Sequence, residues 1–263
     1  MLSEHTVAEA AAAAGIEAPP TFVARTGSTN ADLLRMADQG APAWTVLVAG
    51  HQEAGRGRLG RTWEAPPGSS LLVSVLLRPN VEPDAAPLLS LAAAVAMARA
   101  CEDACGLAVR SKWPNDLMTG RPPRKLGGIL VEGKVEGGQL LHAVVGVGVN
   151  VMQGRDALPE DVRDTATSVV LEGGRPDPAD LLRSFLSAFR TLAADWGRAS
   201  RAATLDAYRA ICDTVGRDVR AARSGGGALE GRATGIGDRG ELLVDTGAGA
   251  TERIGFGEVE HLR

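Results

Sequence analysis

Apolar and polar positions alternate along the chain in blocks that predict short helices and strands. The first 20 residues favour an Ala-rich helix over 7–14, which Gly15 ends. Ser28-Thr29-Asn30 supplies N-cap chemistry for a second helix that runs to about residue 37 and is closed by Gly40. Apolar runs typical of buried strands cover residues 44–49 and 71–77. A longer apolar run over 87–105 predicts a buried helix.

The second half of the chain begins with a short strand over 109–113, which Pro114 stops. Gly137-Gly138 lies between apolar runs 129–134 and 140–149, which is a hairpin signal. Asp177 followed by Pro178 predicts a helix start, and helical periodicity continues to about residue 212.

After residue 214 the pattern changes to short β-type segments separated by Gly-rich turns. The segments cover 215–221, 229–236, 242–245 and 251–255, which is typical of a small β-barrel. We therefore predict an α+β fold with two domains: residues 1–213, with strands and helices mixed, and residues 214–263, a barrel.

Composition narrows the class of protein. The formal net charge is −4, which argues against non-specific nucleic-acid binding. The three cysteines are best interpreted as buried thiols in a reducing compartment. No run of 18 apolar residues occurs, and no basic segment precedes an apolar stretch at the N-terminus. We expect a cytoplasmic protein that does not enter a membrane.

The strongest chemical signal is Gly55-Arg56-Gly57-Arg58-Leu59-Gly60-Arg61, directly after an apolar strand and followed by Trp63. Glycines let the backbone approach an anion closely, and arginine forks suit phosphate or carboxylate oxygens. The loop matches neither the Walker pattern nor a dinucleotide fingerprint. Its alternative is a solvated basic loop.

Three further segments place polar groups at the ends of strands. Lys112-Trp113-Pro114-Asn115-Asp116 offers amide and carboxylate oxygens for Mg²⁺, or it is a plain turn. Lys125-Leu126-Gly127-Gly128 opens a strand with a lysine, a residue that is scarce in this chain, beside two glycines. Gly146-Val147-Gly148-Val149-Asn150 alternates small residues along a strand, and its alternative is a simple core strand.

In this order, the four segments resemble the catalytic domain of biotin–protein ligases. Ser28-Thr29-Asn30, Gln52 and Ala166-Thr167-Ser168 also match blocks of that family. The resemblance covers about residues 21–263. It implies a mixed β-sheet backed by helices, related to the class II aminoacyl-tRNA synthetase core, with a C-terminal SH3-like β-barrel.

The resemblance also implies an activity. Biotin and ATP would give biotinyl-5′-AMP, and a lysine of a biotin carboxyl carrier domain would then accept the biotin, with Mg²⁺ as cofactor. Such chemistry needs positioning and charge stabilisation rather than a protein nucleophile. In agreement, the four histidines lie outside every motif.

Site residues carry over from the resemblance position by position. The catalytic residues would be Lys125 and Arg58, with Lys125 between the biotin carboxylate and the α-phosphate. The biotin-binding residues would be Ser28, Thr29, Asn30, Gln52, Arg56, Gly57, Arg58, Lys125, Gly127 and Gly128. The ATP-binding or adenylate-binding residues would be Gly55, Arg56, Arg58, Gly60, Arg61, Trp63, Lys112, Asn115, Lys125, Asn150 and Arg263. Metal ligands would be Asn115 and Asp116, and the Arg-rich loop is expected to order over the ligand.

The N-terminal segment departs from the family members that double as repressors. About 24 residues precede Arg25 and contain no Lys or Arg, which is too short and wrongly charged for a winged helix-turn-helix. We expect no specific DNA binding, and a weak homodimer stays open. Two other functions are the alternatives. A lipoate or octanoyl ligase would lack the Arg-rich loop, and a non-catalytic biotin sensor could lose Lys125 or the arginines.

Overall fold

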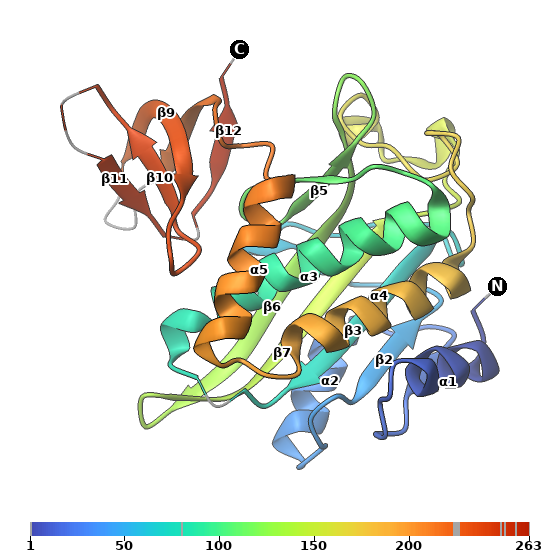
Figure 1. Cartoon of the computed structure of the whole chain (residues 1–263). Helices are drawn as coiled ribbons and strands as arrows, with labels where there is room; N and C mark the ends of the chain where they lie inside the picture. The colour runs from blue at the N-terminus through green and yellow to red at the C-terminus, as the bar shows by residue number, and fades with distance from the viewer. Residues whose placement is uncertain are drawn as a thin grey trace.

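Two β-sheets organise the protein, one of seven strands and one of five (Figure 1). The computed structural model describes residues 2–79, 81–222, 227–247, 249, 251–255 and 257–262. The large sheet has the order β1-β2-β3-β7-β6-β5-β4. Its strands are β1 (Thr21–Val23), β2 (Val46–Ala49), β3 (Ser70–Leu77), β4 (Arg110–Lys112), β5 (Asp116–Thr119), β6 (Arg124–Glu136) and β7 (Gln139–Asn150). Strands β1 and β2 are parallel and the other pairs are antiparallel, so the sheet is mixed, as predicted.

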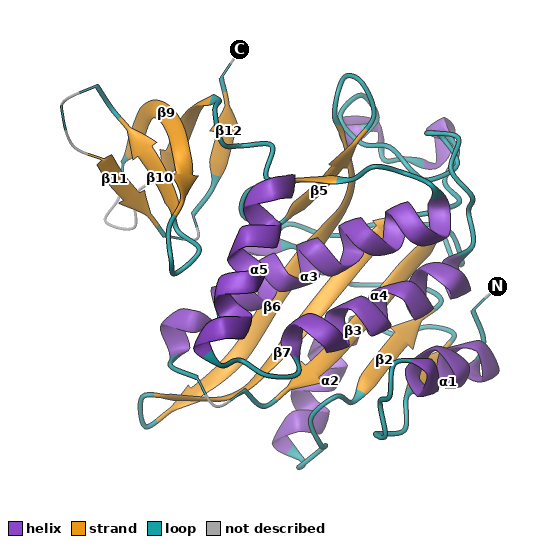
Figure 2. Ribbon diagram, in the orientation of Figure 1, coloured by secondary structure: helices purple, strands orange, loops and turns teal. Residues whose placement is uncertain are grey.

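Helices cover both faces of the large sheet. They are α1 (Glu4–Ala13), α2 (Thr29–Asp38), α3 (Pro87–Ala100), α4 (Pro178–Ala193) and α5 (Arg198–Ile211). Figure 2 shows α3, α4 and α5 lying across one face, and α2 lies on the other. The strand β3 explains the division, because alternate side chains point to opposite faces. Leu71, Val73 and Val75 join the core under α3, whereas Leu76 packs with Leu33 of α2.

Helix α3 is apolar all round because it lies between the sheet and the outer helices α4 and α5. A π-helical turn, Cys101–Cys105, extends it, and Gly106 ends it with a φ of 72°. The segment Pro83–Cys105 is long and apolar enough to cross a membrane by composition, yet 78% of its most apolar window is buried inside the protein. Burial on all sides accounts for this composition without a membrane.

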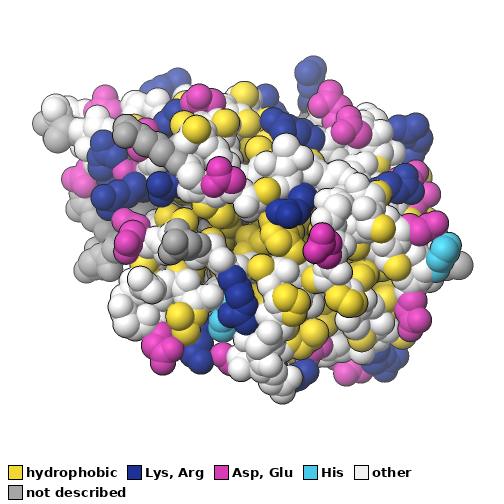
Figure 3. Space-filling model, turned by 60° about the horizontal axis from the view of Figure 1, so that its bottom comes forward, with side chains coloured by type: hydrophobic (Ala, Val, Ile, Leu, Met, Phe, Trp, Pro, Cys, Tyr) yellow, Lys and Arg dark blue, Asp and Glu magenta, His cyan; other side chains and the backbone are white. Residues whose placement is uncertain are grey.

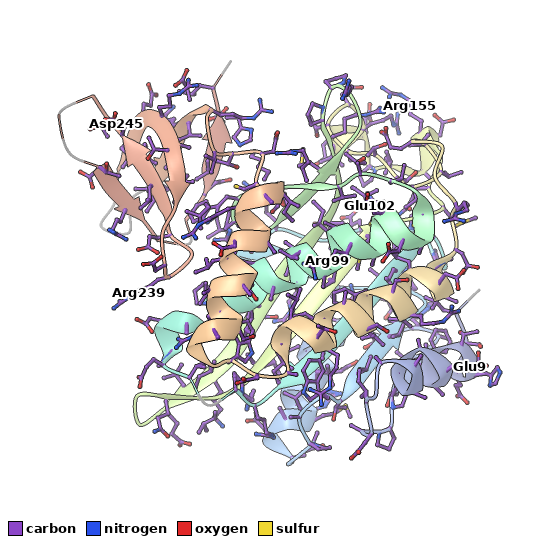
Figure 4. The ribbon with its side chains drawn as sticks, viewed as in Figure 1. Glu9, Arg99, Glu102, Arg155, Arg239 and Asp245 are labelled. Carbon is purple, nitrogen blue, oxygen red and sulfur yellow. The ribbon has the colours of Figure 1, made fainter. Side chains whose placement is uncertain are left out.

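The C-terminal sheet has the order β11-β10-β9-β8-β12. Its strands are β8 (Asp218–Ala222), β9 (Ala228–Ile236), β10 (Leu242–Asp245), β11 (Thr251–Ile254) and β12 (Val259–His261). All pairs are antiparallel, and within the described residues β11 and β12 stay at the edges, so the predicted barrel is seen as an open sheet. Trp113 Nε1 donates to the Gly240 carbonyl (2.9 Å) and ties this sheet to the end of β4. In Figure 4, Arg239 lies at the tip of the β9–β10 hairpin, where its guanidinium is 3.0 Å from the Asp84 carboxylate.

Local sequence signals placed several elements correctly. Ser28 is the N-cap of α2, with its hydroxyl accepting from the Ala31 amide, and Asp177 caps α4. Gly137 and Gly138 form the β6–β7 turn with positive φ angles of 59° and 78°. The sequence does not predict strand β5, because Asn115 and Asp116 after Pro114 are typical of a turn. The segment is a short antiparallel partner of β6.

Candidate functional site

A cavity of about 1180 Å³ lies over the face of the large sheet opposite α3. Its floor is low because small residues alternate along the strands. Gly146 and Gly148 of β7 and Gly128 of β6 line it. On β3, Ser74 is the partner of Gly146 and Leu72 is the partner of Gly148, and Gly128 lies opposite Gly148. A Cβ on Gly146 would lie 2.1 Å from Asn30 Oδ1, and one on Gly148 would lie 2.8 Å from Trp63 Cε2. The two glycines therefore let the Asn30 and Trp63 side chains lie close against the β7 backbone at the cavity.

Most of the predicted site residues meet at this cavity although they come from separate elements. The lining includes Ser28, Thr29, Asn30, Gln52, Arg56, Gly57, Arg58, Gly60, Arg61, Trp63, Lys112, Asn115, Asp116, Lys125, Gly128 and Asn150. Two of the described predicted positions do not line it. Gly127 points to the other face of β6, where a Cβ would meet Leu117 and Val149, because neighbouring strand residues alternate. Gly55 lies against the Trp63 carbonyl, beside a smaller cavity on the outer side of the loop. Arg263 lies outside the described residues.

The Arg-rich loop is a small hairpin of its own. The Trp63 amide donates to the Gly55 carbonyl (2.9 Å), and the Gly57 amide donates to the Arg61 carbonyl (2.7 Å). A 3₁₀ turn over Arg58–Gly60 forms the tip, with Leu59 at a φ of 56° and 69% exposed. The hairpin brings its arginines over the cavity instead of leaving them on a solvated loop.

Four cations at the cavity contact an acceptor within the protein. Arg56 Nη2 donates to Glu132 Oε2 (2.9 Å), and Arg58 Nη1 donates to Asn115 Oδ1 (3.0 Å). Arg61 pairs with Glu258 of the C-terminal domain. Lys125 Nζ is 2.6 Å from Asp116 Oδ1. An anionic ligand would exchange these internal partners for its own oxygens.

Burial shapes the electrostatics of two groups near the cavity. It lowers the pKa of the Arg58 guanidinium, while Asp116 acts in the opposite direction. Burial also lowers the pKa of His261 to about 4, and the positive charges of Lys112 and Arg217 add to this effect. His261 is therefore neutral at pH 7, and its Nε2 shares a hydrogen bond with the Thr214 hydroxyl (3.0 Å), whose oxygen accepts from the Trp113 amide (2.9 Å).

The predicted Mg²⁺ site offers few protein ligands. Within the described ranges no group of three or more His, Cys, Asp or Glu side chains converges. Asp116 and Asn115 offer one carboxylate and one amide oxygen beside the cavity, each already engaged by a cation. Magnesium is commonly bound by one or two carboxylates together with water and substrate phosphates. The residues fit an ion that arrives with a nucleotide rather than one held by the protein alone.

Sequence reasoning missed two parts of the lining. The segment 157–162 contributes Leu158 and Val162, and the C-terminal domain contributes Arg220 and Glu258. Gln153 is also missed: its Nε2 donates to Asn150 Oδ1 (3.1 Å). Glu258 belongs to a C-terminal segment, 257–263, that also resembles the family's ending, but no motif marks the other positions, because their role depends on contacts between distant segments. Figure 3 shows hydrophobic side chains gathered toward the middle of the face in view, with most charged side chains around them.

A glycine floor beneath a hairpin of arginines, facing Lys125 on β6, offers several cations to a carboxylate and a phosphate held side by side. Comparison with known proteins places the chain in the class of biotin and lipoate protein ligases. The family model for the "Biotin/lipoate A/B protein ligase family" matches residues 22–150, and the "Biotin protein ligase C terminal domain" matches 214–262. A biotin–[acetyl-CoA-carboxylase] ligase of Mycobacterium tuberculosis is 38% identical over 247 residues, covering 92% of this chain and 88% of the relative. The chain belongs to the biotin protein ligase family.

Two further relatives agree in sequence and in fold. A bifunctional ligase/repressor BirA of Bacillus subtilis is 33% identical over 223 residues, covering 84% of this chain and 68% of the relative. The structure of the biotin protein ligase from Aquifex aeolicus in complex with biotin and ATP superposes with a TM-score of 0.75 and 24% identity, covering 92% of this chain and 99% of that one. This likeness confirms the predicted fold class.

Proposed function

We propose that the chain is an ATP-dependent biotin–protein ligase that forms biotinyl-5′-AMP and transfers biotin to a lysine of a carrier protein. Family membership supports the activity. The observation that carries it to this chain is the meeting of Lys125, Arg56, Arg58 and Arg61 over one glycine-floored cavity. Such a set of cations suits a carboxylate and a phosphate held side by side.

In the first step, a biotin carboxylate oxygen bonds to the α-phosphorus of ATP and the bond to pyrophosphate breaks. Two anions approach each other, so cations that neutralise them lower the barrier. Lys125 lies at the start of β6, with its backbone amide held by the Thr165 carbonyl (2.7 Å). Among the described residues its ammonium pairs with Asp116, a partner that it can leave for the two anions. Arg58 and Arg61 would hold the phosphates from the opposite side.

In the second step, the lysine amine of the carrier attacks the carbonyl of the adenylate, a C–N bond forms, and AMP leaves as the amine loses a proton. The enzyme has to keep water away from the anhydride until the carrier arrives. Trp63 lies over Gly148 on the cavity floor, and the arginine hairpin covers the same region. Both would shield the adenylate.

Asn115 and Asp116 are the residues that would hold Mg²⁺ when it arrives with ATP. The ion would offset phosphate charge. Asp116 would then have two cationic neighbours, so the pairing with Lys125 has to loosen as the nucleotide binds.

The carrier is proposed to be the biotin carboxyl carrier domain of an acyl-CoA or pyruvate carboxylase. A cytoplasmic location is supported by Cys101, Cys105 and Cys212, which are buried free thiols. The alternatives are less well supported: the non-catalytic sensor has no need of four cations, and a lipoate or octanoyl ligase has no need of the arginine hairpin.

Transfer is tested by mixing the protein with biotin, Mg·ATP and an apo-carrier domain, and detecting biotin on the carrier with streptavidin. The control is the same carrier with its acceptor lysine replaced by arginine. We expect labelling of the first carrier alone. With lipoate in place of biotin, a gain in the intact mass of the carrier would support the alternative ligase, and no modification with either acid would support the sensor.

A further inference from the structure

A chain of hydrogen bonds runs beneath the cavity and joins Gln52 to Arg56. The Thr29 amide and hydroxyl both donate to Gln52 Oε1 (2.8 and 2.9 Å). Ser74 Oγ lies 2.7 Å from Thr29 Oγ1 and 2.6 Å from Asn30 Oδ1.

The chain continues on the far side of Asn30. Its Nδ2 donates to Glu132 Oε2 (2.9 Å) and to the Leu130 carbonyl (3.2 Å). The same Glu132 oxygen accepts from Arg56 Nη2 (2.9 Å). Five elements thus contribute to one continuous network: α2, β3, β6, the segment after β2 and the arginine hairpin.

The chemistry of the partners fixes which atom donates at each contact. Gln52 must present its oxygen to Thr29, because a backbone amide can only donate. Asn30 must present its NH₂ to Glu132 and its oxygen to Ser74, because carboxylates and carbonyls can only accept. Ser74 Oγ is the donor to both Thr29 Oγ1 and Asn30 Oδ1, so its single proton is shared between these two acceptors.

This assignment settles the role of Thr29 toward the cavity. Its proton goes to Gln52 Oε1, and its oxygen accepts from Ser74 Oγ, so both contacts are made within the protein. The hydroxyl thus turns an unshared electron pair to the cavity, where a ligand N–H would be the matching group. The network selects a ligand that donates at this point.

Two members of the network do not line the main cavity. Ser74 is fully buried between α2 and the sheet. Glu132 faces the smaller cavity on the outer side of the hairpin. Neither can touch a ligand in the main cavity, so any effect on the ligand has to pass through Thr29, Asn30 or Arg56.

We propose that Ser74 and Glu132 are positioning residues that set the hydrogen-bonding polarity of Thr29 and Asn30 and couple it to Arg56 of the hairpin. The inference rests on the proposed function, with the ureido ring of biotin as the N–H donor. Ser74 orients the side chains of Thr29 and Asn30, which would contact the ureido ring, and Glu132 links Asn30 to Arg56 of the hairpin.

The test uses Ser74→Ala, Glu132→Gln and the double variant of the full-length protein. Ser74→Ala removes the donor to Asn30, and Glu132→Gln keeps an acceptor for Asn30 while removing the negative charge beside Arg56. Two variants serve as matched controls. Ser111→Ala removes a fully buried hydroxyl whose partner is Tyr208, and Glu241→Gln neutralises a carboxylate that accepts from Arg253 in the C-terminal domain.

The quantities measured are the KM for biotin, the KM for ATP, kcat and the melting temperature. Ser74→Ala should raise the KM for biotin about 10-fold, the effect of one lost buried hydrogen bond. Glu132→Gln should raise it by a similar factor, because it weakens the charge-assisted contact to Arg56. Both variants should change the KM for ATP less than about 2-fold. The double variant should stay near the larger single effect, because the second change breaks a chain that is already broken. The controls should keep the parent KM for biotin.

Three results would overturn the proposal: effects that multiply to about 100-fold in the double variant, equal increases in both KM values, or the same shift in the controls. Glu132→Gln is a half-exposed, isosteric change that keeps the proposal testable even if Ser74→Ala lowers the melting temperature. The proposed function fails separately, if the parent protein itself shows no biotin-dependent turnover.

Discussion

Replacing Lys125 with alanine tests how the cavity promotes adenylation. The ammonium is assigned to charge that concentrates as carboxylate and phosphate bond, so its contribution grows toward the transition state. Removing one preorganised donor from an anion site costs about 10²–10³-fold in rate. The change also leaves the Asp116 carboxylate, now 2.6 Å from the ammonium, without this partner. Without the ammonium, the Asp116 carboxylate repels the biotin carboxylate and the phosphate. We therefore expect the adenylation rate to fall by the upper end of this range, about 10³-fold.

The assay separates chemistry from binding. Rapid-quench measurement of biotinyl-5′-AMP in a single turnover gives the adenylation rate, and calorimetry gives the dissociation constant for biotin. Lys125→Arg is the control that keeps the charge, and it should lose less than about 10-fold. If biotin affinity in Lys125→Ala falls by as much as the rate, the lysine only holds substrate and the reasoning is refuted.

Four further results are expected. Arg58→Gly removes the contact to Asn115, so free biotinyl-5′-AMP should appear and bystander proteins should become biotinylated; full retention of the adenylate would contradict this. Gly148→Ala should raise the KM for ATP, because its Cβ displaces the Trp63 ring; an unchanged KM for ATP would show that the ring moves freely. The folded pKa of His261, about 4, lies below its unfolded value, so its stabilising effect is present above about pH 6.5 and is lost between about pH 6.5 and 4. Thermal melts of His261→Gln should therefore lose about 1–2 kcal/mol less over that range than the parent, after allowance for partial exposure, and parallel curves would contradict the assignment. No gel shift specific for a DNA sequence should survive about 150 mM salt; a specific shift would show a DNA-binding surface.

The sequence predicted those features that depend on neighbouring residues. The cap at Ser28, the helix start at Asp177 and the glycine turn of the β6–β7 hairpin all follow from local chemistry, and each is present. Most motif residues also meet at one cavity, and this was predictable because the family resemblance indicates which segments belong to one site.

The features that were missed depend on long-range geometry. Arg56 contacts Glu132, 76 residues away, and Arg61 contacts Glu258, 197 residues away, and no local pattern announces such pairs. Ser74 is hidden in an apolar run, where only its place on the same face as Leu72 marks it as a neighbour of α2. Strand alternation also explains why Gly128 reaches the cavity and Gly127 does not, which a motif alone could not separate.

Biotin-dependent exchange of label between pyrophosphate and ATP tests the central claim most directly, because it reports adenylate formation without any carrier protein. With Mg²⁺ present, we predict rapid exchange with biotin, and no exchange above background with lipoate, octanoate or no acid. Exchange that is absent with biotin, or faster with lipoate, would contradict the account.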